Sequence, residues 1–320
     1  MLTLPTFPLM QLPTPLHPLP NFSRWLDAGV EMWVKRDDLT GLALGGNKLR
    51  KLTYLLADAL SQDATALITT GAAQSNHCRQ TAAAASKAGL DCHLVLRGGP
   101  EDRPGGNLVL DQLLGAYLHW AGGPDTSAKM TQVVEKLVAA GRQPYAIPLG
   151  GSTPVGASGY AFAWLEMDEQ AQKLGVQFDA VVFATSSGGT QAGLSTGAGE
   201  TNWPGELHGI SVDHTISDLQ AVADPLTAAT AELLQVVQPN PVQVHDAYIG
   251  EGYGIVGEPE RGAIFAMARN EGLLVDPVYT GRALAGLIDL ARKGALQGRV
   301  LFWHTGGTPA LFAYERELLG

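Results

Sequence analysis

The sequence predicts a three-layer α/β fold in which parallel-rich sheets lie between layers of helices. Short apolar segments alternate with longer segments of helical periodicity along most of the 320 residues. Several of the apolar segments run directly into a loop of glycine and hydroxyl residues, and a helical pattern follows. Hydrophobic residues make up 45% of the chain and charged residues 16%, which is typical of a globular protein with a large core.

Composition and charge exclude several classes of function. A net charge of -10 argues against general nucleic-acid binding and against binding to an anionic membrane surface. No apolar run approaches the roughly 18 residues of a spanning helix, and the proline-rich start does not resemble a signal peptide. Cys78 and Cys92 are too few for a disulfide framework or a cysteine-rich metal site. We therefore expect a cytoplasmic protein without a metal centre.

The N-terminal segment, residues 1–24, reads as an extended arm, because proline removes amide donors and disfavours helix in the preceding residue. Val30 to Lys35 is a short strand candidate. The acidic pair that follows, Asp37 and Asp38, could bind a metal or act in acid–base catalysis. We favour the interpretation that these aspartates cap a turn and pair with Lys35 or Arg36.

The segment from Gly45 to Lys51 is the strongest local signal. Two glycines allow a tight turn, and the leucines that follow Lys48 have helical spacing. Lys48 is thus predicted at a helix N-terminus, where free N–H groups and the macrodipole attract anions. An amine beside an anion site could form a Schiff base with a phosphorylated aldehyde cofactor. The alternative is an ordinary surface helix with solvated cations.

The middle of the chain predicts a β–loop–α–β unit of a parallel sheet. The elements expected there are a strand at 65–70, a helix at 81–88, a strand at 91–97, helices at 107–118 and 127–141, a strand at 145–148 and a helix at 159–174. The loop from Gly71 to His77 follows the first of these strands. Ligands of α/β proteins bind at such carboxyl ends of strands.

The second half continues the alternation. It predicts strands at 180–184, 207–212 and 299–303, and helices from Gln191 and at 215–237, 260–271 and 282–293. Residues 185–190 join a buried strand to a helix with hydroxyls and glycines, which could surround a phosphate. They are not a Walker A loop, and a plain strand–turn–helix is the alternative.

Four further motifs have competing interpretations. Gly252 to Gly257 matches G-x-G-x-x-G, but residues 246–252 are poor strand material, so a dinucleotide site is disfavoured. Ser75 lacks the G-x-S-x-G pattern of a hydrolase nucleophile. His304 ends the last strand and could be structural or catalytic. Tyr279, expected at a strand end, is by itself more often a packing residue.

Taken together, the motifs resemble those of the fold-type II pyridoxal-phosphate enzymes, in the family of 1-aminocyclopropane-1-carboxylate deaminase and D-cysteine desulfhydrase. The resemblance covers nearly the whole chain. It rests on Pro13–Leu16, Val34–Asp38, Gly45–Lys51, Gln74–His77, Gly252–Gly254, Asp276–Gly281 and His304–Gly307.

The resemblance implies a role for each matching residue, with pyridoxal 5'-phosphate as the cofactor. Lys48 would carry the cofactor covalently and act in catalysis with Ser75 and Tyr279. The other cofactor-binding residues would be Asn47, Lys51, Asn76, Ser187, Gly188, Gly189, Thr190, Tyr279, Thr280 and Thr305. Asn76 would bond the ring hydroxyl, and Tyr279 would stack on the ring. The substrate would meet Ser75, Asn76, His77 and Tyr253.

One position separates the two branches of this family. The deaminase branch has glutamate where this chain has Thr280, and Thr305 also matches the desulfhydrase branch. A neutral hydroxyl leaves the cofactor a weaker electron sink, which suits β-elimination. The resemblance therefore favours a lyase that converts D-cysteine to pyruvate, ammonia and hydrogen sulfide.

The alternatives are the deaminase reaction, elimination from cysteate, D-serine or β-chloro-alanine, and a catalytically silent protein that binds the cofactor. The resemblance also implies a homodimer. It further implies a large cofactor-binding domain of residues 1–53 and 161–320, with a small α/β domain of residues 54–160.

Overall fold

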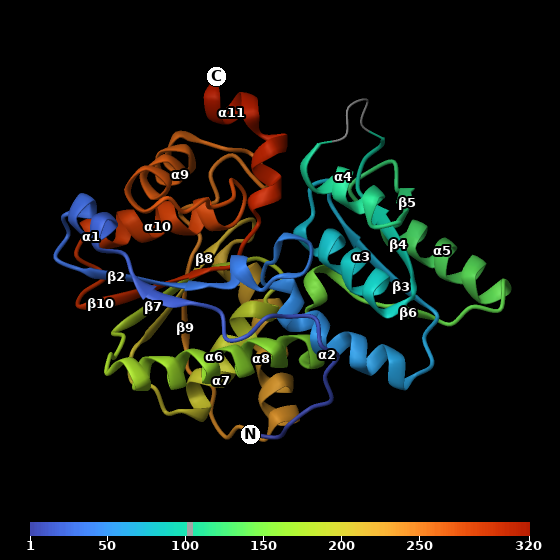
Figure 1. Ribbon diagram of the computed structural model, residues 1–320, viewed down its shortest axis with the longest axis horizontal. Helices are drawn as coiled ribbons and strands as arrows, with labels where there is room; N and C mark the ends of the chain where they lie inside the picture. The colour runs from blue at the N-terminus through green and yellow to red at the C-terminus, as the bar shows by residue number, and fades with distance from the viewer. Residues whose placement is uncertain (101–104) are drawn as a thin grey trace.

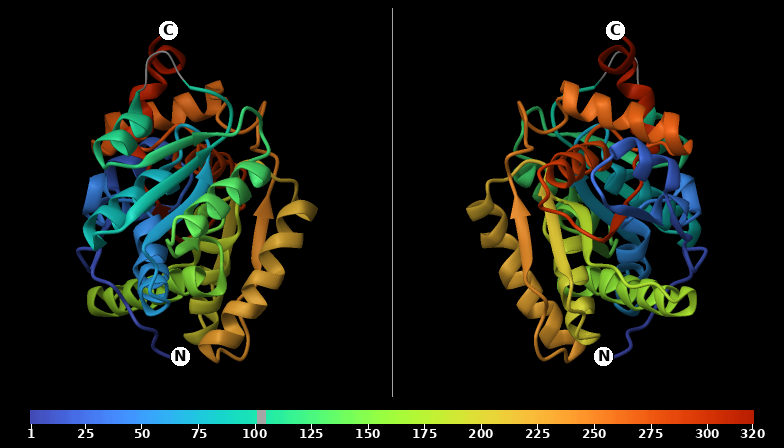
Figure 2. Two further views of the ribbon diagram at one scale, coloured as in Figure 1. Left: turned by 90° about the vertical axis from the view of Figure 1, so that its right-hand side faces the viewer. Right: turned by 90° about the vertical axis from the view of Figure 1, so that its left-hand side faces the viewer.

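The computed structural model describes residues 1–100 and 105–320 and contains two β-sheets with helices on their faces (Figure 1). The N-terminus and the C-terminus lie at opposite ends of the molecule (Figure 2). Within the described ranges, no helix is both long enough and apolar enough to cross a membrane. The predicted α/β class with parallel-rich sheets is confirmed.

The larger sheet has six strands in the order β1-β2-β10-β7-β8-β9. Its strands are β1 (Leu16–Pro18), β2 (Glu31–Arg36), β7 (Ala180–Thr185), β8 (Glu206–Ser211), β9 (Val242–His245) and β10 (Arg299–His304). Only the β1–β2 pair is antiparallel. The other strands therefore place their carboxyl ends at one edge.

The smaller sheet is parallel throughout, in the order β5-β4-β3-β6. Its strands are β3 (Ala66–Gly71), β4 (Asp91–Leu96), β5 (Tyr117–Trp120) and β6 (Pro144–Ala146). All four lie within residues 66–146. The division into domains at residues 54 and 160 remains a prediction.

Helices cover both faces of the larger sheet, and the alternation along β10 shows why. Val300 and Phe302 pack with residues of α1, α9 and α10, whereas Leu301 and Trp303 pack with residues of α6 and α7. Successive strand residues point to opposite faces, so a strand covered on both sides is apolar throughout. The helices are α1 (Pro20–Leu26), α2 (Lys48–Ser61), α3 (Asn76–Ala88), α4 (Gly106–Leu113), α5 (Ser127–Ala139), α6 (Pro154–Leu174), α7 (Gly189–Glu200), α8 (Ile216–Leu234), α9 (Glu258–Glu271), α10 (Thr280–Arg292) and α11 (Glu315–Leu319).

Several predicted elements were wrong in extent or type. The arm at 1–24 contains β1 and the start of α1, whose Pro20 occupies the first turn, where a missing N–H costs nothing. The helix expected at 107–118 ends at Leu113, and β5 follows. Strand β9 was not predicted. Tyr279 does not end a strand; it is the N-cap of α10.

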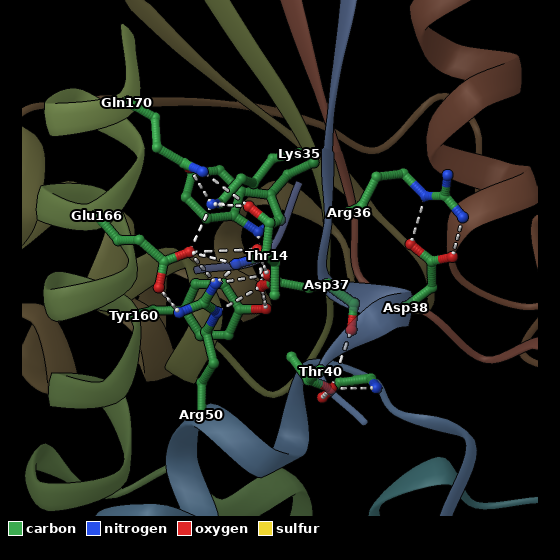
Figure 3. A network of polar contacts seen from close by, with 12 residues as sticks. Thr14, Lys35, Arg36, Asp37, Asp38, Thr40, Arg50, Tyr160, Glu166 and Gln170 are labelled. Atoms are coloured by element: carbon green, nitrogen blue, oxygen red, sulfur yellow. Dashed lines mark hydrogen bonds and ion pairs between the residues drawn. The ribbon is translucent and has the colours of Figure 1, made fainter. Parts of the chain in front are cut away.

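A buried network of charged groups joins α2, α6 and β2 beside the start of α2 (Figure 3). The Arg50 guanidinium donates to both oxygens of Asp37, at 2.7 and 2.8 Å, and to Glu166 at 2.9 and 3.1 Å. Lys35 adds a 2.5 Å contact to Glu166. Asp38 pairs with Arg36 as predicted, but Asp37 binds Arg50 instead. The network holds α2 in place two residues beyond Lys48.

Candidate active site

A cavity, partly open to solvent, lies where the carboxyl ends of β3 and β7 face the start of α2. Loops at these strand ends supply most of its walls, as expected for a ligand site in a parallel α/β protein. Its lining includes the predicted residues Asn47, Lys48, Ser75, His77, Ser187, Gly188, Thr190, Tyr253, Tyr279 and Thr305. The structure thus gathers most of the predicted site in one place.

The loop before Lys48 needs both of its glycines. Gly45 and Gly46 have φ values of +63° and +122°, and a Cβ on Gly45 would lie 2.2 Å from the Asp38 carbonyl oxygen. Asn47 then ties the loop to the end of β10 and to the start of α7. Its N–H donates to the Thr305 carbonyl at 2.9 Å, and its Nδ2 donates to Thr190 Oγ1 at 3.3 Å. The chain therefore presents Lys48 to the cavity as the first residue of α2.

Lys48 has an amine suited to nucleophilic attack. Burial lowers its pKa to about 8, and the charge of Asp276 only partly offsets this effect. Its Nζ lies 5.9 Å from the centroid of the Tyr279 ring. An amine that is neutral in a sizeable fraction near neutral pH can attack an aldehyde, whereas an ordinary lysine is almost fully protonated there.

A candidate anion-binding cradle lies beside the cavity at the N-terminus of α7. Ser187 Oγ and Ser152 Oγ are 2.8 Å apart, and the Gly189 N–H donates to Ser152 Oγ at 3.2 Å. A Cβ on Gly189 would lie 2.6 Å from both Ser152 Oγ and Lys51 Nζ. Glycine at 189 therefore keeps hydroxyls, N–H groups and an amine close together, which suits a phosphate.

Lys51 supports the same assignment. It is 1% exposed, its Nζ donates to the Gly150 carbonyl at 3.1 Å, and no carboxylate in the described ranges forms an ion pair with it. Burial, together with the charge of Lys48, lowers its pKa well below the usual value. A buried amine without an acid partner is costly unless an anion binds beside it. The donor set fits a cofactor phosphate.

Ser75 and His77 lie in the cavity wall at the start of α3. Ser75 is the N-cap of this helix, and its Oγ accepts the Cys78 N–H at 3.2 Å. The His77 Nε2 lies 2.9 Å from Thr69 Oγ1. Burial and the charges of Lys48 and Lys51 hold the pKa of His77 well below its usual range, so the ring is neutral. His77 bonds Thr69, and among the described residues it has no hydrogen bond to Ser75, which a hydrolase base would need.

Tyr253 and Tyr279 meet through their hydroxyls, which are 2.7 Å apart. Burial raises the pKa of Tyr253 to about 12 and that of Tyr279 well above its usual value, so both are protonated. Arg282, which the sequence analysis missed, donates to the carbonyls of Gly252 and Ile255 at 3.1 and 2.8 Å. These contacts hold the backbone on each side of Tyr253.

The G-x-G-x-x-G match at 252–257 lies in this turn region, and β9 ends at His245. A dinucleotide fingerprint requires a strand directly before the first glycine. The nicotinamide interpretation is therefore not supported.

Thr280 lies behind the cavity wall and is fully buried. Its hydroxyl donates to Asp276 Oδ1 at 2.7 Å and accepts the Asp276 N–H at 2.7 Å. Asp276 also accepts the N–H groups of Val278 and Tyr279, at 3.1 and 3.0 Å. The cluster fixes the turn that presents Tyr279.

His304 has backbone partners at both ring nitrogens. Its Nε2 lies 3.1 Å from the Leu274 carbonyl, and its Nδ1 accepts the Gly306 N–H at 3.2 Å. This geometry supports the structural interpretation of His304, because the ring has no nitrogen left for substrate.

The remaining predicted residues, Lys51, Asn76, Gly189 and Thr280, lie behind the lining rather than in it. Two charged lining residues were missed, Arg97 and Asp213, and Ser186 lies within the predicted 185–190 loop but was not among the predicted site residues. Ser186 Oγ donates to Asp213 Oδ2 at 3.0 Å. Each of the three follows the end of a strand closely, so the rule that ligands bind at the carboxyl ends of strands could have found them.

Comparison with known proteins gives a consistent result. Residues 8–306 match the family model of pyridoxal-phosphate dependent enzymes. A Pyrococcus horikoshii protein with the provisional name 1-aminocyclopropane-1-carboxylate deaminase is 43% identical over 98% of this chain and 95% of its own length. A Klebsiella pneumoniae D-cysteine desulfhydrase is 41% identical over 98% of this chain and 97% of its own length.

Solved structures agree with these relatives. A crystal structure described as that of an aminocyclopropane-carboxylate deaminase homologue superposes with a TM-score of 0.93 at 42% identity, and covers 99% of this chain and 96% of that chain. The fold is therefore that of a fold-type II enzyme. The chain belongs to the pyridoxal-phosphate dependent enzymes, as a pyridoxal-phosphate-dependent lyase of the group that includes aminocyclopropane-carboxylate deaminases and D-cysteine desulfhydrases.

Proposed function

We propose that this lyase converts D-cysteine and water to pyruvate, ammonia and hydrogen sulfide by β-elimination. When bound, the cofactor supplies an aldehyde that joins to amines and an electron sink for the carbanion. Lys48 would hold the cofactor, and the Ser187–Thr190 turn with Lys51 would bind its phosphate. Asn76 would donate to the ring oxygen, and Tyr279 would pack on the ring.

The proton transfers fall to residues around Lys48. The Lys48 amine, displaced by the substrate amine and with its pKa lowered to about 8, would accept the α proton. Ser75 and Tyr279 are the other candidates for part of this transfer. Positioned acid–base groups contribute on the order of 100- to 10,000-fold in rate. Ser75, Asn76, neutral His77 and Tyr253 would face the substrate.

The hydrogen bonding of the Thr280 hydroxyl is the observation that carries the choice of reaction. Its single hydroxyl proton is donated to Asp276, 2.7 Å away, so it has no proton to share with a ring nitrogen. The deaminase branch has a carboxyl group at this position, which can hold such a proton. A weaker electron sink favours a substrate whose leaving group departs soon after the α proton, as sulfide does from D-cysteine.

The deaminase reaction is the second candidate, since three relatives from Pyrococcus carry that provisional name and the matching crystal structure is described as a deaminase homologue. The substrate panel that separates the candidates is D-cysteine, L-cysteine, cysteate, D-serine, β-chloro-alanine and aminocyclopropane-carboxylate. Pyruvate and sulfide from D-cysteine are expected. Formation of 2-oxobutyrate from aminocyclopropane-carboxylate, without pyruvate from D-cysteine, would refute the proposal.

A silent binding protein would be yellow but inert to every compound in the panel. Matched Thr280→Glu and Thr280→Ser variants test whether the neutral hydroxyl at position 280 is the reason that β-elimination is preferred. Glutamate should lower elimination and serine should retain it, with cofactor content measured for both.

We further propose a homodimer with a small domain of residues 54–160, inserted in a large domain of residues 1–53 and 161–320. The sheet of β3 to β6 within residues 66–146 supports the division. Cys78 and Cys92 are both buried free thiols, which suits a reducing cytoplasm. Sedimentation analysis of the cofactor-loaded protein tests the dimer.

A further inference from the structure

Asn107 is a fully buried polar residue at the start of α4, behind the wall of the cavity. Its Nδ2 donates to the Gln74 carbonyl oxygen at 2.9 Å and to Asn76 Oδ1 at 2.8 Å. Its backbone N–H donates to Gln74 Oε1 at 2.9 Å, and Gln74 Nε2 donates to the Gly105 carbonyl at 3.0 Å. The start of α4 is therefore hydrogen-bonded to the loop that carries Asn76.

The contacts determine which way each amide faces. A backbone carbonyl can only accept, so the Asn107 atom beside the Gln74 carbonyl must be the NH₂ group. The same NH₂ group lies beside Asn76, so the Asn76 atom that it meets must be the carbonyl oxygen, Oδ1. The Asn76 NH₂ group must then face away from Asn107. The backbone of Gln74 thus fixes the orientation of a side chain two residues further along.

The NH₂ group of Asn76 faces the turn at Gly307. Its Nδ2 would lie 2.9 Å from a Cβ built on Gly307, and Asp276 Cγ would lie 2.6 Å from the same point. Glycine at 307 leaves room there, beside the turn that presents Tyr279. We propose that Asn107 is a positioning residue, which holds the Asn76 amide with its donor toward the cofactor's ring oxygen.

The inference rests on the proposed function, in which Asn76 binds that oxygen. Without Asn107, either end of the Asn76 amide could face the cofactor. The carbonyl end would repel the electron-rich ring oxygen, whereas the NH₂ end donates to it. A residue that touches no part of the cofactor would thereby control a hydrogen bond to it.

The experiment compares Asn107→Leu with Asn107→Asp. Leucine removes the donor, whereas aspartate keeps the size and shape but attracts the Asn76 NH₂ group to itself and turns the amide around. If Asn107 only fills space, both variants should bind the cofactor normally once they are folded. We expect aspartate to be at least as harmful as leucine, with pyridoxal 5'-phosphate bound about 10-fold or more weakly, the size of one hydrogen bond to a charged group.

The pH midpoint of the visible absorption band of the loaded enzyme gives a spectroscopic readout. We expect it to move upward in both variants, because the ring oxygen loses a donor that competes for its electrons. Gln112→Glu is the matched control, since it makes the same amide-to-acid change on the exposed face of α4. Circular dichroism and urea unfolding check that each variant folds.

A double-mutant cycle with Asn76→Ala separates the outcomes. The inference predicts that Asn107 substitutions weaken cofactor binding in the wild-type background and add little once Asn76 is alanine. Effects that persist undiminished in the Asn76→Ala background, or an Asp variant milder than the Leu variant, would overturn the positioning role and leave the proposed function intact. A normal affinity and spectrum for Asn76→Ala itself would instead refute the cofactor role of Asn76.

Discussion

Replacing Arg50 by methionine tests how the buried charge network supports the helix that carries Lys48. Arg50 is 2% exposed and donates to both oxygens of Asp37 and of Glu166. Methionine keeps much of the apolar volume but leaves Asp37 buried without its main cation. Loss of one partner from a buried ion pair costs about 3–5 kcal/mol of unfolding free energy.

The remaining partners of Asp37 set the expected value within that range. Tyr160 and Trp303 each donate to Asp37 Oδ2 at 2.8 Å. Thr14 donates to Oδ1 at 3.0 Å. These donors stabilise the carboxylate partly, so we expect the lower end, about 3 kcal/mol. Adding Asp37→Asn removes the unpaired charge, and the double variant should be more stable than Arg50→Met alone.

The unfolding free energy lost in Arg50→Met, its stability deficit, should depend on pH because of the pKa of Asp37. Burial raises this pKa, but attraction and hydrogen bonding from Arg50 outweigh it and hold it below the usual value. In the wild type, ionised Asp37 contributes to stability at pH values above its pKa in the unfolded chain. That contribution is lost as pH falls through the lower pKa that Asp37 has in the folded protein. In Arg50→Met burial dominates and raises the folded pKa, so the variant loses stability as pH rises.

Urea unfolding of the loaded enzyme between about pH 5 and pH 8 measures this difference. We expect the deficit of Arg50→Met to be larger at the higher pH. A deficit that does not change with pH, together with a double variant no more stable than Arg50→Met, would refute the reasoning.

Three further predictions concern the cavity. Gly189→Ala places a Cβ 2.6 Å from Lys51 Nζ, so cofactor affinity should fall about 10-fold or more. The control, Gly262→Ala, has nothing within 4 Å of the added carbon and should bind the cofactor normally. Equal affinities of the two variants would contradict phosphate binding at the cradle. Because the pKa of Lys48 is lowered to about 8 by burial, the rate at which apoprotein reacts with added pyridoxal 5'-phosphate should rise with a midpoint near 8; a midpoint near that of an ordinary lysine would be inconsistent with it. Tyr253→Phe removes the 2.7 Å contact with Tyr279 and should lower kcat/KM about 2- to 10-fold without weakening cofactor binding, measured by equilibrium dialysis.

The parts of the fold that sequence predicts well are set by local pattern. The apolar run from Ala180 and the glycines before Lys48 each determine their own backbone, so the strand and the helix start were found. The missed strands, β1, β5 and β9, lie at the edges of their sheets and have only three or four residues each. An edge strand lacks the continuous apolar pattern of a buried one.

The residues of the candidate site also differ in whether a local sequence pattern marks them. Lys48 and the Ser187–Thr190 turn are recognisable because a helix N-terminus and a hydroxyl–glycine loop have local signatures. Asn107 and Arg282 have none, since their partners are backbone carbonyls and side chains up to 70 residues away. The pairing of Asp37 with Arg50 was missed because only the tertiary fold brings the turn after β2 beside α2.

Covalent attachment of the cofactor to Lys48 is the central claim, and Lys51, which lies behind the cavity lining, is the rival amine. Borohydride reduction of the loaded enzyme, followed by peptide mass spectrometry, identifies the modified lysine directly. We predict the cofactor on Lys48, and its absence, together with loss of the visible band, in Lys48→Ala. A label on Lys51, or a visible band that persists in Lys48→Ala, would contradict the account.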